Sequence, residues 1–322
     1  MASLDSLLSS ATANVSSAAL GIDNMLGFIS PPVPASTAKG YTAVYAFGDS
    51  LSDAGNIAYS TRGAVPASPP YSDGRFSNGP VWIQDLSQDL GLPPVKASLA
   101  GGTDFAYGGA ETGPTPVHAV NPTDLPGQVA QFAVDDPIRQ PDALYAVWIG
   151  SNDVLDIANH ITDPVQQQAD VATAVQNEVS AISSLVALGA KDLLVLNVPN
   201  IGESPYEVER GPVISATASS LSGLYNQELA SSLQGLMASG AAKVDLLDTY
   251  SLLDEAIANP GPYGFTNVTS PVWNGDLTSP SSGTMAATGT AQSKYLFFDD
   301  LHPTAQTHAL LASAAFQSLP MA

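Results

Sequence analysis

The sequence predicts an α/β fold, a three-layer α/β/α sandwich built around a parallel sheet. From Tyr41 onward, short apolar runs alternate with longer segments whose apolar residues recur every three or four positions. The later apolar runs are nearly continuous, as expected for parallel strands that helices cover on both faces. Alternation of this kind is typical of βαβ units.

Five segments are expected to form strands because they are rich in residues that favour strands and are bounded by turn-forming residues. They are residues 42–47, a short segment at 103–106, and residues 143–149, 192–198 and 243–247.

Four segments between and after these runs are expected to be helical because their apolar residues fall on one face. The last begins after Pro303, which is well placed to start a helix. They are residues 81–90, 165–186, 221–236 and 304–319.

Residues 1–40 differ from the rest and are expected to be an N-terminal extension ending in a Pro-rich linker. Their apolar residues suit one or two weakly amphipathic helices, and Pro31-Pro32-Val33-Pro34 would end them. Two interpretations stay open, an arm or extension of the main domain and a targeting leader. Residues 41–322 show no repeat and no clear boundary, which favours one domain.

Three long segments depart from the regular pattern, namely residues 57–79, 111–127 and 260–294. The last is longer than compact folds usually need and carries Tyr263, Phe265, Trp273 and Met285. We expect it to be a wall or lid of a substrate pocket; the alternative is a surface excursion.

The composition excludes several classes of function. The chain has 30 acidic and 9 basic residues, a formal net charge of -21, which disfavours binding to nucleic acid or to an anionic membrane surface. It has no cysteine, so disulfides and thiolate sites are excluded. There is no apolar run long enough to span a bilayer, and the N-terminus does not match an intact signal peptide.

Polar segments follow the expected strands at the edge where open α/β sheets bind ligands. Ser50 follows the first strand, Gly108 and Gly109 follow the second, Asn152 follows the third, and an Asp-Asp-Leu-His-Pro sequence at 299–303 precedes the last helix. Because the carboxyl ends of parallel strands meet at one edge, these segments can converge.

Together these residues are sufficient for acyl transfer. A serine nucleophile needs a base, and His302 with Asp299 three residues earlier provides an imidazole and its carboxylate partner. The backbone N–H groups of Ser50 and Gly109 and the side-chain amide of Asn152 would stabilise the oxyanion. Each motif alone is common in ordinary turns. A metal held by Asp299, Asp300 and His302 is conceivable, but it is disfavoured because the chain has no cysteine and no paired histidines.

In their order along the chain, these blocks resemble those of the GDSL esterases and lipases, also called SGNH hydrolases. The blocks are Phe-Gly-Asp-Ser-Leu-Ser-Asp at 47–53, Phe-Ala-Tyr-Gly-Gly-Ala at 105–110, Gly-Ser-Asn-Asp at 150–153 and Asp-Asp-Leu-His-Pro-Thr at 299–304. The resemblance covers nearly all of residues 41–319. It implies a flavodoxin-like α/β/α sandwich and a serine esterase or lipase without metal or cofactor.

The resemblance also implies roles for individual residues. Ser50 would be the nucleophile, Asp299 and His302 the base system, and Gly109 and Asn152 oxyanion donors. Gly108 is a close rival of Gly109, and Asp300 of Asp299. Asp104 departs from the family, in which Asn commonly stands before Phe-Ala.

The remaining motif residues are expected to have structural roles. Asp49, Asp53 and Asp153 should hold turns by accepting backbone N–H groups. His308 should be structural, and His118 and His160 should lie in loops or on helix surfaces.

The expected substrate is a small ester or lipid, and acyl transfer to an alcohol or lipid would use the same acyl-enzyme. A different class of function, a catalytically idle surface- or carbohydrate-binding module, is disfavoured because Ser50, Asp299 and His302 are all present. Resemblance to exported family members favours a secreted or periplasmic protein over a cytoplasmic one.

Overall fold

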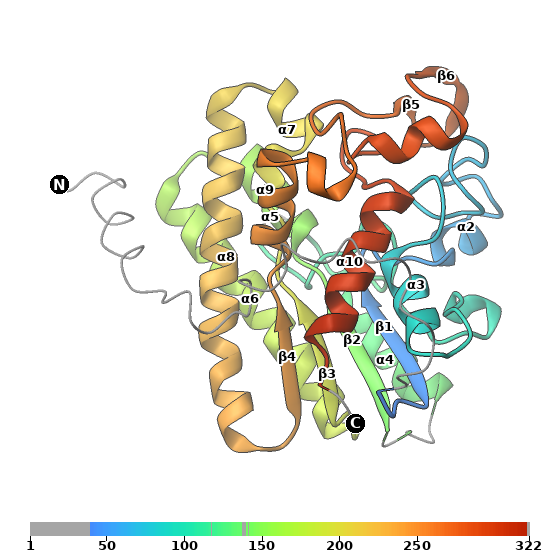
Figure 1. Cartoon of the computed structure of the whole chain (residues 1–322). Helices are drawn as coiled ribbons and strands as arrows, with labels where there is room; N and C mark the ends of the chain where they lie inside the picture. Colours follow the sequence, from blue (N-terminus) through green and yellow to red (C-terminus); the bar gives the residue numbers. More distant parts are fainter. Residues whose placement is uncertain (1–38, 117, 137–139, 141, 321–322) are drawn as a thin grey trace. The chain divides into compact units, whose positions relative to one another are not determined.

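A computed structural model of the chain describes residues 39–116, 118–136, 140 and 142–320. Its centre is a parallel sheet in the order β1 (Ala43–Gly48), β2 (Ala143–Trp148), β3 (Asp192–Leu196) and β4 (Lys243–Leu247). The strands pair in close register, with Gly48 opposite Trp148 and Trp148 opposite Leu196. Their carboxyl ends therefore lie at one edge of the sheet, as expected for the predicted α/β fold (Figure 1).

The strand predicted at 103–106 is reduced to two isolated bridges of Asp104, one to Ala46 of β1 and one to Ala97. The Ala46 N–H donates to the Thr103 carbonyl, 3.1 Å away, and the Phe105 N–H donates to the Ala46 carbonyl, 2.7 Å away. The Asp104 carboxylate accepts the N–H groups of Ala54 and Ala106, so the chain turns away before a ladder forms. With this segment beside β1, the order matches the flavodoxin-like arrangement.

Helices pack on both faces of the sheet. The predicted helices are α3 (Trp82–Asp89), α6 (Pro164–Ala187), α8 (Pro212–Ser239) and α10 (Ala305–Ser318). The sequence patterns did not predict α2 (Asn56–Ser60), α4 (Leu125–Asp135), α5 (Ser151–His160), α7 (Pro205–Glu209) and α9 (Thr249–Ala258).

The two layers follow from the alternation of side chains along each strand. Tyr45, Phe47 and Tyr145 point to one face, where α4, α6 and α8 pack in the main core. Trp148 points to the other face, where its ring meets that of Trp82 on α3, 5.7 Å between centroids. Helix α10 packs beside α3 on this second face (Figure 1).

Residues 260–294 do not form the extended loop that the sequence predicted. They contain short 3-10 turns at Gly261–Tyr263 and Gly289–Lys294 and a hairpin of β5 (Trp273–Asp276) and β6 (Ser279–Met285). Phe265 and Trp273 are buried in separate small clusters with residues outside the segment. The segment therefore carries aromatic residues because they are buried in apolar clusters, and not because they belong to a mobile loop.

Residues 1–38 lie outside the described residues, so the extension and the domain boundary near residue 40 stay predictions. Within the described part of the chain, the helices lack the combination of length and apolar character that crossing a bilayer requires.

Candidate active site

Ser50 lies in the turn that follows β1, with only 8% of its surface exposed. The turn depends on Gly48, which has φ +153° and lies against β2. A Cβ there would be 2.1 Å from the Trp148 carbonyl oxygen, so only glycine fits. The Asp49 carboxylate accepts the Leu51 N–H and holds the turn, as predicted for it.

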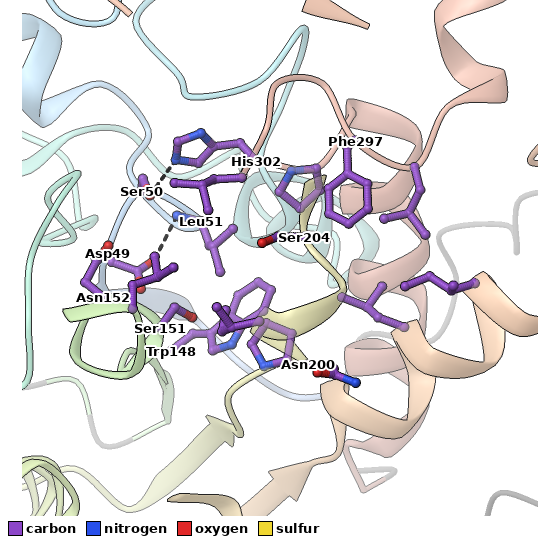
Figure 2. Close-up of a pocket in the computed structure, with 18 of the residues that line it drawn as sticks. Asp49, Ser50, Leu51, Trp148, Ser151, Asn152, Asn200, Ser204, Phe297 and His302 are labelled. Carbon is purple, nitrogen blue, oxygen red and sulfur yellow. Dashed lines mark hydrogen bonds between the residues drawn. The ribbon is translucent and has the colours of Figure 1, made fainter. Parts of the chain in front are cut away.

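His302 and Asp299 meet Ser50 although they lie about 250 residues further along the chain. The Ser50 Oγ is 2.8 Å from His302 Nε2, and His302 Nδ1 is 2.8 Å from Asp299 Oδ2 (Figure 2 shows the contact of Ser50 with His302). The backbone N–H of His302 also donates to Asp299, at 2.6 Å. This arrangement is the one expected of a serine nucleophile, a histidine base and a carboxylate that orients the base.

The charges within this group stabilise one another. Burial disfavours the imidazolium, but the carboxylates of Asp299, Asp300 and Asp49 together outweigh burial, and the pKa of His302 lies above its ordinary value. Burial likewise disfavours the Asp299 carboxylate, yet His302 and the hydrogen bonds lower the pKa of Asp299. An ionised Asp299 beside a readily protonated imidazole is what general-base catalysis needs.

Asp300 is exposed and does not hydrogen-bond His302, so the geometry selects Asp299 as the partner. A residue that the sequence did not indicate is also present. The hydroxyl of Tyr71 donates to Asp299 Oδ2 at 2.7 Å, and the pair is buried. Tyr71 lies in the segment 57–79, in which no periodic pattern points to Asp299.

The glycine block lies beside the serine turn and is held there by Asp53. The Asp53 carboxylate accepts the N–H groups of Gly55, Asn56, Ile57 and Gly108, the last at 2.9 Å. The Gly108 N–H is therefore engaged, whereas Gly109 is the exposed residue of the pair.

Asn152 lies in the first turn of α5, directly after β2. Its Nδ2 donates to the Ala110 carbonyl at 2.8 Å, which brings it to the glycine block. The preceding Gly150 has φ +103°, and a Cβ there would be 2.6 Å from the Tyr225 ring. The Asp153 side chain accepts the N–H and hydroxyl of Thr112, so it binds a backbone N–H as predicted, but one 41 residues away and not in its own turn.

Asp104, the departure from the family, is fully buried near Asp53. Burial first, and then the Asp53 carboxylate, raise the pKa of Asp104. Nearby, the Asn56 amide donates to the carbonyls of Asp104 and Ala106 at 2.8 and 2.9 Å. The serine turn and the glycine block are thus joined by buried hydrogen bonds.

A narrow cavity of about 60 Å³ opens beside Ser50 and His302. Figure 2 shows Ser50, Asn152 and His302 on one side of it and Asn200 on the other. Its walls are mainly apolar and include Trp148, Leu155, Ile201, Leu253, Ile257 and Phe297.

No residue of 260–294 lines this cavity, so the predicted wall or lid is wrong. Its aromatic side chains pack into the neighbouring clusters instead. Helix α9 supplies that wall through Leu253 and Ile257. The signal for α9 was present in the sequence, as Asp248 before the apolar residues Leu252, Leu253, Ala256 and Ile257.

The other histidines lie elsewhere. His308 is buried on α10, and its Nδ1 accepts the Trp82 N–H at 3.2 Å, a structural contact. His160 is exposed at the end of α5. His118 lies in a loop, as expected, but carboxylates contact both of its ring nitrogens.

Comparison with known proteins identifies the family of this chain. A family model described as GDSL-like Lipase/Acylhydrolase matches residues 44–315. A phosphatidylcholine-sterol acyltransferase of Aeromonas hydrophila is 27% identical, over 90% of this chain and 94% of its own. A GDSL esterase/lipase of Arabidopsis thaliana is 27% identical, over 90% and 91%.

An acetylesterase of Thermothelomyces thermophilus is 29% identical, over 83% of this chain and 85% of its own. The matched range contains all four blocks, from Ser50 to His302. The chain therefore belongs to the GDSL-like lipases and acylhydrolases and is a serine hydrolase of carboxylic esters.

Proposed function

We propose that Ser50 is the nucleophile, His302 the general base and Asp299 the residue that orients it. The observation that supports this most is the run of hydrogen bonds from Ser50 through His302 to Asp299 beside an apolar cavity. We also propose that the N–H groups of Ser50 and Gly109 and the Asn152 amide bind the oxyanion. The engagement of Gly108 with Asp53 supports Gly109 as the donor.

In this proposal His302 Nε2 removes the Ser50 proton as Oγ attacks the ester carbonyl. The carbonyl oxygen becomes an oxyanion, held by the three donors. The C–O bond to the alcohol then breaks, and the imidazolium gives its proton to the leaving alkoxide. A water molecule, deprotonated by His302, attacks the acyl-enzyme; the acid leaves and Ser50 recovers its proton.

We propose an ester with an aliphatic acyl chain as the substrate class. The apolar side chains of Leu155, Leu253 and Ile257 along the cavity support this. By their names, one relative is a phosphatidylcholine-sterol acyltransferase and another is an acetylesterase, which leaves the acyl chain length to be measured.

The first experiment is hydrolysis of p-nitrophenyl esters from acetate to palmitate by the wild type and by Ser50→Ala. We expect activity that is lost in the variant and a chain-length optimum that reflects the cavity. Ser52→Ala is the matched control, because Ser52 lies in the same motif but its Oγ accepts the Trp82 indole N–H at 3.0 Å. Full activity in Ser50→Ala would refute the assignment.

If the wild type is inactive on all of these esters, fluorophosphonate labelling distinguishes two explanations. Labelling that requires Ser50 would mean a reactive serine with another ester substrate. Absence of labelling would favour the idle binding module.

Acyl transfer is a second function through the same acyl-enzyme, and the similarity to the acyltransferase along 90% of the chain favours testing it. With a long-chain ester and an added alcohol, transfer would give the new ester in competition with free acid. Free acid alone at all alcohol concentrations would exclude transfer to that acceptor.

We further propose that the protein acts outside the cytoplasm, because the family members it resembles include exported enzymes. Immunodetection in the medium, periplasmic and cytoplasmic fractions of the source cells tests this. Protein confined to the cytoplasmic fraction would refute it.

A further inference from the structure

A second group of polar side chains takes no part in the proposed reaction. Glu111 follows the glycine block, His118 lies in the next loop, and Asp156 lies on α5. A carboxylate oxygen of Glu111, a ring nitrogen of His118 and a carboxylate oxygen of Asp156 lie within 4.8 Å of one another. We call these three residues the Glu111 cluster.

Glu111 is the buried member of the cluster, with 5% of its side chain exposed. Its Oε1 is 3.1 Å from His118 Nδ1. Its Oε2 is buried and has no hydrogen-bond partner among the described residues, and the carboxylates of Asp153 and Asp156 lie near Glu111. A buried carboxylate oxygen that lies near another carboxylate needs a proton or a cation to compensate it.

Asp124 orients the histidine of the cluster. His118 Nε2 is 2.8 Å from Asp124 Oδ2, and the Asp124 carboxylate also accepts the N–H groups of Glu111 and Asn121. A carboxylate in this position holds the proton on Nε2 and leaves the lone pair on Nδ1 to face the cluster. Metal-binding histidines commonly have their second nitrogen fixed by a carboxylate in this way.

The separation of two of the ligand atoms also suits a metal. In a tetrahedral zinc site with bonds of about 2.0–2.1 Å, two ligand atoms lie about 3.3 Å apart. The observed separation of Glu111 Oε1 and His118 Nδ1 is 3.1 Å. Imidazole with carboxylates suits zinc and neighbouring transition metals, whereas calcium takes oxygen ligands only.

We propose that Glu111, His118 and Asp156 bind a divalent transition-metal ion, with zinc preferred to calcium and water as the fourth ligand. The ion would join the glycine block, the loop around His118 and α5. Since Gly109 and Asn152 lie on two of these segments, it would stabilise the fold next to the oxyanion donors without touching substrate. The proposal does not depend on the esterase mechanism.

The competing arrangement has no metal. His118 would then be an imidazolium that donates to Glu111 and Asp124, and a proton would lie between Glu111 and Asp156. The two arrangements differ in whether the intact protein takes up one metal ion at this position.

The test is calorimetric titration of the chelator-treated full-length protein with zinc chloride. We expect one ion per chain, a higher melting temperature with zinc than with chelator, and weaker binding of calcium. His118→Ala should abolish this binding. Asp124→Asn, which keeps an oxygen acceptor for the Glu111 N–H group but weakens the orienting contact, should reduce zinc affinity by about 10–100-fold.

His160→Ala is the matched control, because His160 is an exposed histidine whose Nδ1 lies 3.8 Å from the same Asp156. It should bind zinc as the wild type does, and circular dichroism should show that each variant is folded. Anomalous diffraction from zinc-soaked wild-type crystals needs no variant and should place the ion about 2.0–2.2 Å from the ligand atoms. Absence of zinc binding, unchanged affinity in folded His118→Ala, a preference for calcium, or an ion at other residues would each overturn the proposal.

Discussion

The side-chain amide of Asn152 has two N–H donors, one of which already donates to the Ala110 carbonyl at 2.8 Å. If the other binds the oxyanion, Asn152→Ala should lower kcat by about 10²–10³ with a smaller effect on KM. Steady-state kinetics on the best p-nitrophenyl ester measures both constants.

Asn159→Ala on the same helix is the matched control for this prediction. The Asn159 amide also donates to a backbone carbonyl, that of Leu155, at 2.7 Å, but Asn159 does not line the cavity. It should keep nearly full kcat. An equal loss in both variants would show that Asn152 acts by supporting α5 and not by binding the oxyanion.

Tyr71 donates to Asp299, the carboxylate that we propose orients the base, and its loss should change the pH profile. The hydrogen bond helps to keep the pKa of Asp299 low, so in Tyr71→Phe the carboxylate is more basic and stabilises the imidazolium of His302 more strongly. Since only neutral His302 can accept the Ser50 proton, the acid limb of kcat/KM should move to higher pH. An unchanged acid limb, measured on folded protein, would leave Tyr71 with a packing role only.

Sequence alone could indicate Ser50, Asn152, Asp299 and His302 as candidate site residues because each lies in a short local motif. It could not predict Tyr71, which meets Asp299 across 228 residues and has no motif around it. It also could not decide between Gly108 and Gly109, since the choice depends on which N–H the Asp53 carboxylate engages.

At the scale of elements, α9 forms an apolar wall of the cavity through Leu253 and Ile257. Ile257→Phe adds volume to this wall and should shift the chain-length optimum towards shorter esters. We expect the ratio of kcat/KM for palmitate to that for butyrate to fall by about tenfold or more, the size of effect that small changes in an apolar pocket produce.

Ala258→Phe is the matched control for the α9 prediction, because Ala258 is the next residue on the helix but is exposed and outside the cavity. Its ester profile should match that of the wild type. If Ile257→Phe also keeps the wild-type profile, the acyl chain does not lie along α9.

The elements that the sequence predicted well are those with one dominant pattern. Strands β2 and β3 are continuous apolar runs that are buried along nearly their whole length, and α6 has a clear apolar face. The sequence overestimates the strand structure at 103–106 because the Asp104 carboxylate binds the N–H groups of Ala54 and Ala106. The role of 260–294 was misjudged because its aromatic residues pack against partners that are distant in the sequence.

For the whole molecule, the parallel sheet explains why the motif residues could be placed together before the structure was known. The residues that follow parallel strands lie at the same edge of the sheet. Because β1 and β2 are adjacent, Ser50 and Asn152 are expected to be neighbours. The Glu111 cluster is different. It joins two loop residues and a helix residue that no spacing rule relates, so it required the folded chain.

The same fold buries several carboxyl groups, and this should make stability fall as pH rises. Burial is the main cause in each case and raises the pKa of Asp49 to about 7, of Asp153 to about 6 and of Glu178 to about 8. In the unfolded chain these carboxyl groups have pKa values of about 4. At a pH between about 4 and the folded pKa of a group, the folded protein therefore holds a proton that the unfolded chain has released. The resulting stabilisation is complete below about pH 4 and is lost as pH rises through each folded pKa, by about 1.4 kcal/mol per pH unit for each group.

Urea unfolding in the presence of chelator should therefore give a higher midpoint at pH 5 than at pH 8.5. His302 acts in the same direction because its folded pKa is raised, and Asp299, with its lowered pKa, is ionised throughout this window. Glu178→Gln cannot ionise and keeps an acceptor for the Tyr225 hydroxyl, so it should reduce the pH dependence. Exposed Glu255→Gln should leave the dependence unchanged. A midpoint that rises between pH 5 and 8.5 would mean that the folded protein does not hold these protons.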